Sequence, residues 1–158
     1  MLDCSPADYV DLASRVAPEI RKRSGAPVVG AATTRINQSF PNHRDYKRAM
    51  VDAGLLDFVD VCNFHWYGEQ LEKLFFGGIA DFLNSSGKRV WCTESGERGS
   101  TNQLGHARDV FPALDDQIDR FDRIYVFTYF DGEGPPTTYG LVANDGLESD
   151  LYQFLRDS

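Results

Sequence analysis

Apolar and polar positions follow two different periods along the chain, and together they predict alternating helices and strands. Apolar side chains recur every three or four residues, the spacing of an amphipathic helix, at residues 5–25, 43–53, 69–83, 102–120 and from 147 onward. Short apolar runs between these segments predict strands at residues 27–32, 58–65, 89–94 and 124–130. Ser5 and Gly25 suit the start and end of the first helix, and Pro18 is expected to kink or split it.

The order of these elements predicts an α/β fold in one domain over residues 1–158. Strict alternation of helices and strands is typical of a parallel sheet with right-handed crossovers. Four parallel strands suit either a small doubly wound sheet or half of an eight-stranded (β/α)8 barrel. The chain has no GxGxxG or P-loop sequence, and its polar residues gather after strand ends, which favours the half-barrel.

Composition and net charge indicate which classes of binding partner suit the chain. Hydrophobic residues make up 42% and charged residues 25% of the 158-residue chain, which is ordinary for a globular domain. The formal net charge of −8 argues against nucleic acid or an anionic membrane as a partner. No apolar run approaches the ~20 residues of a membrane-spanning helix, and no signal peptide opens the chain. These features do not indicate the cellular compartment of the protein.

The three cysteines do not suggest a disulfide framework or a metal site. The chain has no CxxC pair and no histidine at metal-ligand spacing. Alternation along a strand places Cys92 on the same face as Glu94, whereas it turns Cys62 away from the face of His65. Cys62 and Cys92 are therefore expected to be free, buried thiols.

The strand at residues 89–94 and the loop after it carry the strongest chemical signal. This strand ends on Glu94, and Ser95-Gly96 follow at once, which is how an α/β barrel presents a catalytic group at its carboxyl face. His65 and Tyr67 share one face at the end of the preceding strand, where they are expected to orient Glu94. Each of these residues is also compatible with an ordinary surface or core role.

Two motifs in this region resemble a known group of enzymes. The segment Phe58–Tyr67 (FVDVCNFHWY), followed by Val90–Gly96 (VWCTESG), resembles strands six and seven of the clan A glycoside hydrolases. In these (β/α)8-barrel enzymes the T-E-x-G glutamate is the nucleophile of a retaining mechanism, a role that the resemblance assigns to Glu94. Residues 124–130 look like strand eight, and the helix at residues 5–25 looks like the one that follows strand four. The chain is therefore similar to the C-terminal half of such a barrel, strands five to eight.

The resemblance also implies a carbohydrate substrate and suggests which residues contact it. His65 and Tyr67 are candidates for hydrogen bonds to sugar hydroxyls. Trp66 and Tyr129 are candidates for stacking, because the C–H faces of sugars pack on aromatic rings, and the ordinary core is the alternative for both. The resemblance implies no metal and no cofactor.

One catalytic group of the family is missing from the chain. The family's acid/base glutamate follows an asparagine at the end of strand four, which would lie just before Ser5. Strands one to four are absent with it, and a barrel needs roughly 200 residues or more, so one copy cannot close.

Three interpretations follow from the missing half. The chain is a fragment that carries the nucleophile half of a retaining glycosidase, a half-barrel that dimerises through its open sheet edges, or a non-catalytic carbohydrate-binding or structural remnant. In the dimer, the partner's Asp131 or Glu133 would stand near the acid/base position. The required separation is the ~5–5.5 Å of a retaining carboxylate pair.

Overall fold

A parallel sheet forms the centre of the chain in this computed structural model, which describes residues 4–33, 35–37, 42–131 and 139–158. The sheet has three strands in the order β1-β2-β3, namely β1 (Val61–Tyr67), β2 (Arg89–Gly96) and β3 (Phe121–Val126). Both pairings are parallel, as the alternation of helices and strands predicts.

The first predicted strand, residues 27–32, is reduced to a single bridge at the edge of β1. Val29 bridges Val61 in parallel, and the Gly30 amide donates to the Val61 carbonyl at 3.0 Å. The segment forms no further bridge after Val29, and residues 35–37 adopt a turn beside the end of β1. The prediction of four strands is therefore wrong for the described residues, which contain three.

The described part of the chain forms seven helices. They are α1 (Pro6–Ser24), α2 (Asn42–Asp52), α3 (Leu55–Phe58), α4 (Leu71–Phe75), α5 (Ile79–Asn84), α6 (Gln103–Gln117) and α7 (Asp150–Asp157).

Local signals explain where several of these helices begin and end. α1 starts at a capping box on Ser5 and ends at Gly25, whose φ of 65° suits a glycine. The helix continues through Pro18, so the predicted split does not occur. The single helix predicted at residues 69–83 is instead the pair α4 and α5, because Gly78 adopts a φ of 73° between them.

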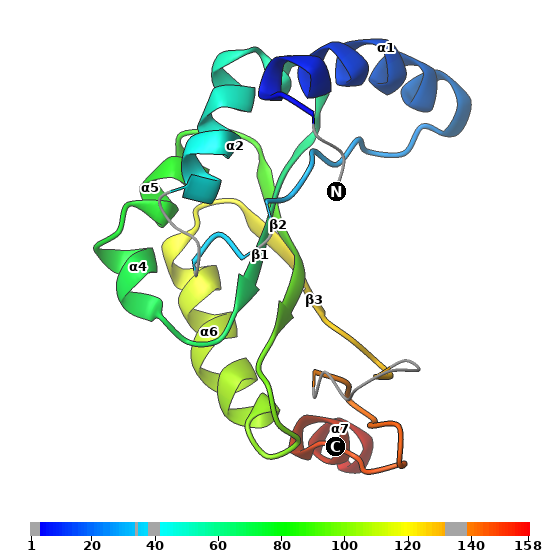
Figure 1. The fold of residues 1–158 in the computed structure, drawn as a ribbon, viewed down its shortest axis with the longest axis vertical. Helices are drawn as coiled ribbons and strands as arrows, with labels where there is room; N and C mark the ends of the chain where they lie inside the picture. Colours follow the sequence, from blue (N-terminus) through cyan, green and yellow to red (C-terminus); the bar gives the residue numbers. More distant parts are fainter. Residues whose placement is uncertain (1–3, 34, 38–41, 132–138) are drawn as a thin grey trace.

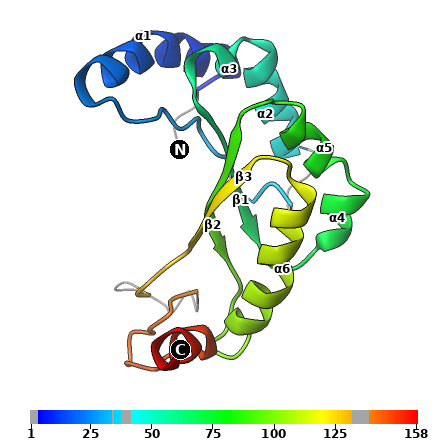
Figure 2. The ribbon, with the colours of Figure 1, turned by 180° about the vertical axis from the view of Figure 1, so that it is seen from behind.

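The helices cover one face of the sheet. In Figures 1 and 2, α2, α4, α5 and α6 lie together on one side of the strands. The main hydrophobic core fills the layer between them and includes Phe64, Trp66, Leu83, Cys92 and Val110. On the opposite face, Tyr125 and Phe127 remain 42% and 37% exposed. This arrangement is consistent with part of a (β/α)8 barrel, in which further strands would close over the inner face.

Two cysteines lie in the main core. Cys62 and Cys92 are free and buried, as predicted, but Cys92 faces the helices and not the side of Glu94. Strict alternation fails because β2 contains a bulge. The consecutive residues 64 and 65 of β1 pair with Cys92 and Glu94, which leaves Thr93 as the extra residue.

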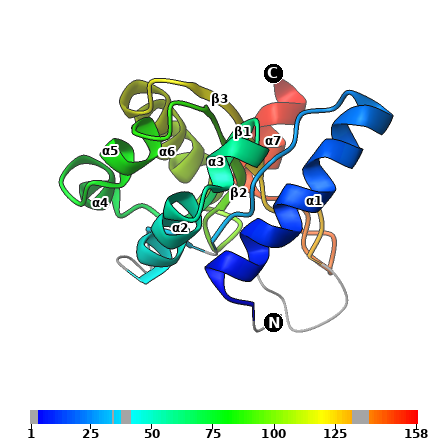
Figure 3. The ribbon, with the colours of Figure 1, turned by 90° about the horizontal axis from the view of Figure 1, so that it is seen from above.

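Apolar side chains are exposed at both ends of the structure. α1 lies beside α2 and α3 at one end (Figure 3), and it leaves an apolar stripe exposed, formed by Leu12, Val16 and Ile20. α7 lies at the other end, towards which β1 and β2 point (Figure 1), and it buries Leu151. Two other apolar side chains of α7, Phe154 and Leu155, are 47% and 56% exposed. Across the described residues, we find no helix with the length and apolar content that crossing a membrane requires.

Candidate active site

The carboxyl ends of β1 and β2 bring the three predicted central residues together. His65 lies opposite Glu94 in the register, and Tyr67 lies opposite Gly96. The bulge at Thr93 shifts the register of β2 by one residue, so that Glu94 turns towards the face of His65 and Tyr67. The sequence therefore predicted the group but not the bulge that assembles it.

Tyr67 holds the Glu94 carboxylate directly. Its phenol donates a hydrogen bond to Glu94 Oε2 at 2.5 Å. Burial raises the pKa of Tyr67 well above its usual range, and the hydrogen bond to Glu94 and the charge of Glu94 raise it further. The phenol therefore stays protonated and remains a donor, while the Glu94 side chain is 36% exposed and open to an incoming molecule.

His65 lies on the other side of the same carboxylate oxygen. Its Nδ1 is 3.3 Å from Glu94 Oε2, without the geometry of a hydrogen bond, and its Nε2 is 3.2 Å from Thr93 Oγ1. The Thr93 hydroxyl donates to Asn63 Oδ1 at 2.8 Å. Thr93 therefore connects His65 to Asn63, and His65 forms an ion pair with Glu94 only when the ring is protonated.

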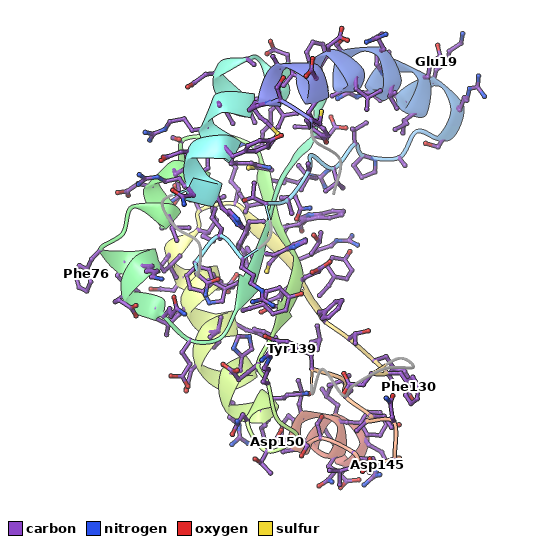
Figure 4. The ribbon with its side chains drawn as sticks, in the orientation of Figure 1. Glu19, Phe76, Phe130, Tyr139, Asp145 and Asp150 are labelled. Carbon is purple, nitrogen blue, oxygen red and sulfur yellow. The ribbon has the colours of Figure 1, made fainter. Side chains whose placement is uncertain are left out.

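An aromatic cluster supports Tyr67 from the side. The Tyr67 ring packs edge-on against Tyr139 and Phe127, with ring centroids 5.2 and 6.0 Å apart. The guanidinium carbons of Arg35 and Arg98 lie 5.6 Å from the Tyr67 centroid and 5.4 Å from the Tyr139 centroid. Figure 4 shows Tyr139 near the carboxyl ends of the strands. Sequence reasoning missed Tyr139 and Arg35, since both come from loops with no regular pattern.

The structure does not bring Trp66 and Tyr129 to Glu94. Trp66 has no exposed surface, and its Nε1 donates to the Gly68 carbonyl at 3.0 Å. Its position between His65 and Tyr67 turns it towards the helices, so stacking of Trp66 on a sugar is incompatible with this structure. Tyr129 is 61% exposed and packs edge-on against Tyr152 at 6.0 Å, and its role in stacking stays a prediction.

Of the two acids predicted for a dimer, one can be placed. Glu133 lies outside the described residues. Asp131 is buried, and its Oδ1 accepts a hydrogen bond from the Gly140 amide at 2.8 Å. Asp131 therefore joins the two ends of its own loop, and it would have to leave this contact to donate a proton elsewhere.

No metal site accompanies this group in the part of the chain that the structure describes. No cluster of three or more His, Cys, Asp or Glu side chains there has the arrangement to hold an ion.

The lowered pKa values of three histidines predict how the free energy of unfolding depends on pH. Desolvation lowers the pKa of His43, His65 and His106, and nearby carboxylates oppose this effect at His65 and His106. The folded chain therefore binds fewer protons than the unfolded chain as the pH falls below about 6.5. We expect the urea midpoint of unfolding to fall when the pH is lowered from about 7.5 to about 5.5.

The carboxyl groups of Asp8 and Asp60 do not contribute to this change in the urea midpoint, because their protonation affects stability only at lower pH. The hydrogen bond from the Ser5 hydroxyl lowers the pKa of Asp8, and hydrogen bonds from the Val28 amide and Arg21 lower the pKa of Asp60. Their stabilising contribution is lost only below about pH 4. A urea midpoint that stays constant or rises between the two pH values would contradict the prediction.

Comparisons with known proteins bear on the fold. No protein-family profile matches the chain, and no curated protein matches it. Among solved structures, a GH128 (subgroup III) curdlan-specific exo-β-1,3-glucanase from Blastomyces gilchristii is similar, with a TM-score of 0.61 and 19% identity. The match covers 78% of this chain and 54% of the glucanase.

Two further structures extend the likeness. A GH128 (subgroup II) endo-β-1,3-glucanase from Sorangium cellulosum matches over 97% of this chain and 62% of its own, with a TM-score of 0.64 and 19% identity. An endo-β-1,4-mannanase from Thermotoga petrophila matches over 92% of this chain and 35% of its own, with a TM-score of 0.53 and 15% identity. The chain thus spans little more than half of the first glucanase. The chain shares the fold of part of each of these structures.

Proposed function

We propose that this chain carries the nucleophile half of a retaining O-glycosidase site, with Glu94 as the nucleophile. The observation that carries the proposal is the 2.5 Å hydrogen bond from Tyr67 to a partly exposed Glu94, at the ends of adjacent parallel strands. Such a bond fixes the carboxylate without neutralising it, because the phenol of Tyr67 stays protonated. The likeness to glycoside hydrolase folds supports the same reaction class, as does the T-E-x-G sequence in its resemblance to clan A enzymes.

The proposed chemistry proceeds in two steps. A Glu94 carboxylate oxygen attacks the anomeric carbon, the bond to the leaving-group oxygen breaks, and a glycosyl ester forms on Glu94. Water then attacks the anomeric carbon of the ester, which releases the sugar with retained configuration and restores the carboxylate, and the proton that the water loses balances the one that the leaving-group oxygen takes up. Tyr67 holds Oε2, so we assign the attack to Oε1. We also assign hydrogen bonds with hydroxyl groups of the sugar to His65 and Tyr67.

We further propose that a second half-barrel completes the site. The group formed by Glu94, Tyr67 and His65 has no second carboxyl group that could protonate an ordinary leaving group. The chain also spans only 54% and 62% of two glucanases that share its fold. The open edges and the exposed apolar stripe of α1 suit association of two copies around a two-fold axis. Light scattering on a size-exclusion column should give a mass near twice 17.7 kDa. A monomer at every concentration would contradict self-association.

An activated substrate tests the nucleophile apart from the missing acid. Dinitrophenolate leaves without protonation, so a dinitrophenyl 2-deoxy-2-fluoro-β-glucoside requires only the nucleophile. The fluorine slows hydrolysis of the ester, and we expect intact-mass spectrometry to show one added fluoroglucosyl group. Peptide mapping should place it on Glu94. The β-galactoside and β-mannoside analogues serve as alternative sugars. Labelling on another residue, or with none of the three sugars, would overturn the assignment.

A carbohydrate-binding remnant is the competing function. Such a protein would bind β-glucan oligosaccharides without forming an ester, and Glu94→Gln would leave its affinity unchanged or improve it. The fluoroglucoside labelling separates the two functions, because only the enzyme forms an ester on Glu94, and calorimetric titration with a β-1,3-glucan oligosaccharide then measures the binding that a remnant would retain.

A further inference from the structure

Asn37 makes an unusual pair of contacts at the edge of β1. The residue is fully buried, although it lies in a short turn. Its Nδ2 donates to the Tyr67 carbonyl at 2.8 Å, and its Oδ1 accepts from the Tyr67 amide at 3.3 Å. One side-chain amide therefore satisfies both backbone polar groups of the residue that bonds Glu94.

The Asn37 side chain makes the bonds that a neighbouring strand would otherwise make at this edge of the sheet. The neighbouring Ile36 amide donates to the His65 carbonyl at 3.2 Å, so the turn runs along β1 beyond the single bridge at Val29. A neighbouring strand would normally pair with the Tyr67 backbone at this position. The Asn37 side chain supplies the same donor and acceptor, and it fixes the last residue of β1 at an otherwise open edge.

The position of the Tyr67 backbone decides whether its phenol reaches Glu94. The phenol oxygen lies at the far end of the side chain, so a small backbone rotation moves it by more than a hydrogen bond tolerates. We propose that Asn37 is a positioning residue that holds the Tyr67 phenol on the Glu94 carboxylate. The inference rests on the proposed function only in treating Tyr67 and Glu94 as a catalytic pair.

A second asparagine provides a matched control. Asn84 Nδ2 donates to the Gln117 carbonyl at 3.1 Å, and Asn84 Oδ1 accepts from the Asp119 amide at 3.0 Å. This pair of bonds joins the end of α5 to the end of α6, where no residue of the candidate site takes part. Asn84→Ala and Asn37→Ala thus remove the same kind of contact, but only the second touches Tyr67.

Titration of the Tyr67 phenol by carbon NMR tests the proposal without requiring turnover. Its ring signal is assigned among the seven tyrosines by Tyr67→Phe. In the wild type and in Asn84→Ala we expect Tyr67 to stay protonated through the alkaline range in which the chain is folded. In Asn37→Ala we expect it to titrate at least about one pH unit lower, towards the ordinary value of about 10. Equal behaviour of the two alanine variants would overturn the inference.

Two further measurements keep the result interpretable. If Asn37→Ala does not fold, hydrogen exchange of the wild type decides: a Tyr67 amide protected like those inside β1 supports the inference, and a rapidly exchanging one overturns it. The fluoroglucoside labelling is a separate readout. A shifted Tyr67 titration without any labelling of the wild type would retain Asn37 as the residue that positions Tyr67 and reject the glycosidase function.

Discussion

Glu94→Gln should lower the rate of dinitrophenyl β-glycoside hydrolysis at least about a thousandfold. The amide has nearly the same shape as the carboxylate but is a poor nucleophile, so the glycosyl ester no longer forms. The Tyr67 phenol, 2.5 Å from Oε2 in the wild type, can still donate to the amide oxygen. The fold should therefore survive the substitution, and release of dinitrophenolate measures the loss directly.

Glu97→Gln is the matched control for this experiment. Glu97 follows the same strand and bonds the Arg98 amide, outside the contacts of Glu94. We expect its rate to stay within about threefold of the wild type. A small anion supplies a further check, because azide can enter the space freed in Glu94→Ala and attack the same face of the sugar. A β-glycoside should then yield an α-glycosyl azide. Glu94→Gln and Glu97→Gln variants with equal rates would remove Glu94 from the mechanism.

The features that the sequence predicted correctly are those that depend on neighbouring residues alone. The cap of α1 at Ser5 and the stop at Gly25 follow from neighbouring residues alone, and the structure agrees. The shared face of His65 and Tyr67 follows from strand alternation. The same rule, applied to Trp66 between them, also indicates that it faces away from the site, so the stacking role assigned to Trp66 conflicted with it.

Other features depend on contacts between distant segments. The bulge at Thr93 arises from the pairing of β2 with β1, and it moved Cys92 into the core against simple alternation. Asn37 resembles any other polar loop residue until the edge of β1 is seen beside it. The apolar run at residues 27–32 has the composition of a strand, but it pairs with β1 through one bridge, between Val29 and Val61.

Trp66→Ala should destabilise the fold by about 3–5 kcal/mol, the cost of removing a large ring from a packed core. Trp66 is fully buried between β1 and the helices, and its Nε1 donates to the carbonyls of Gly68 and Glu69 at 3.0 and 3.1 Å. A loss of this size is a large fraction of the stability of a typical domain. Urea unfolding followed by far-UV circular dichroism measures it.

Phe76→Ala is the control for Trp66→Ala, because it removes an exposed aromatic ring in place of a buried one. Phe76 projects from the outer side of the structure beside α4 (Figure 4) and is 89% exposed, so its removal should change stability by no more than about 0.5 kcal/mol. Trp66→Phe keeps most of the core volume, and we expect it to bind sugar as the wild type does, since the Trp66 ring points away from Glu94. If Trp66→Phe instead lost sugar affinity while retaining stability, the ring would belong to the binding site, and the assignment of Trp66 to the core would fail.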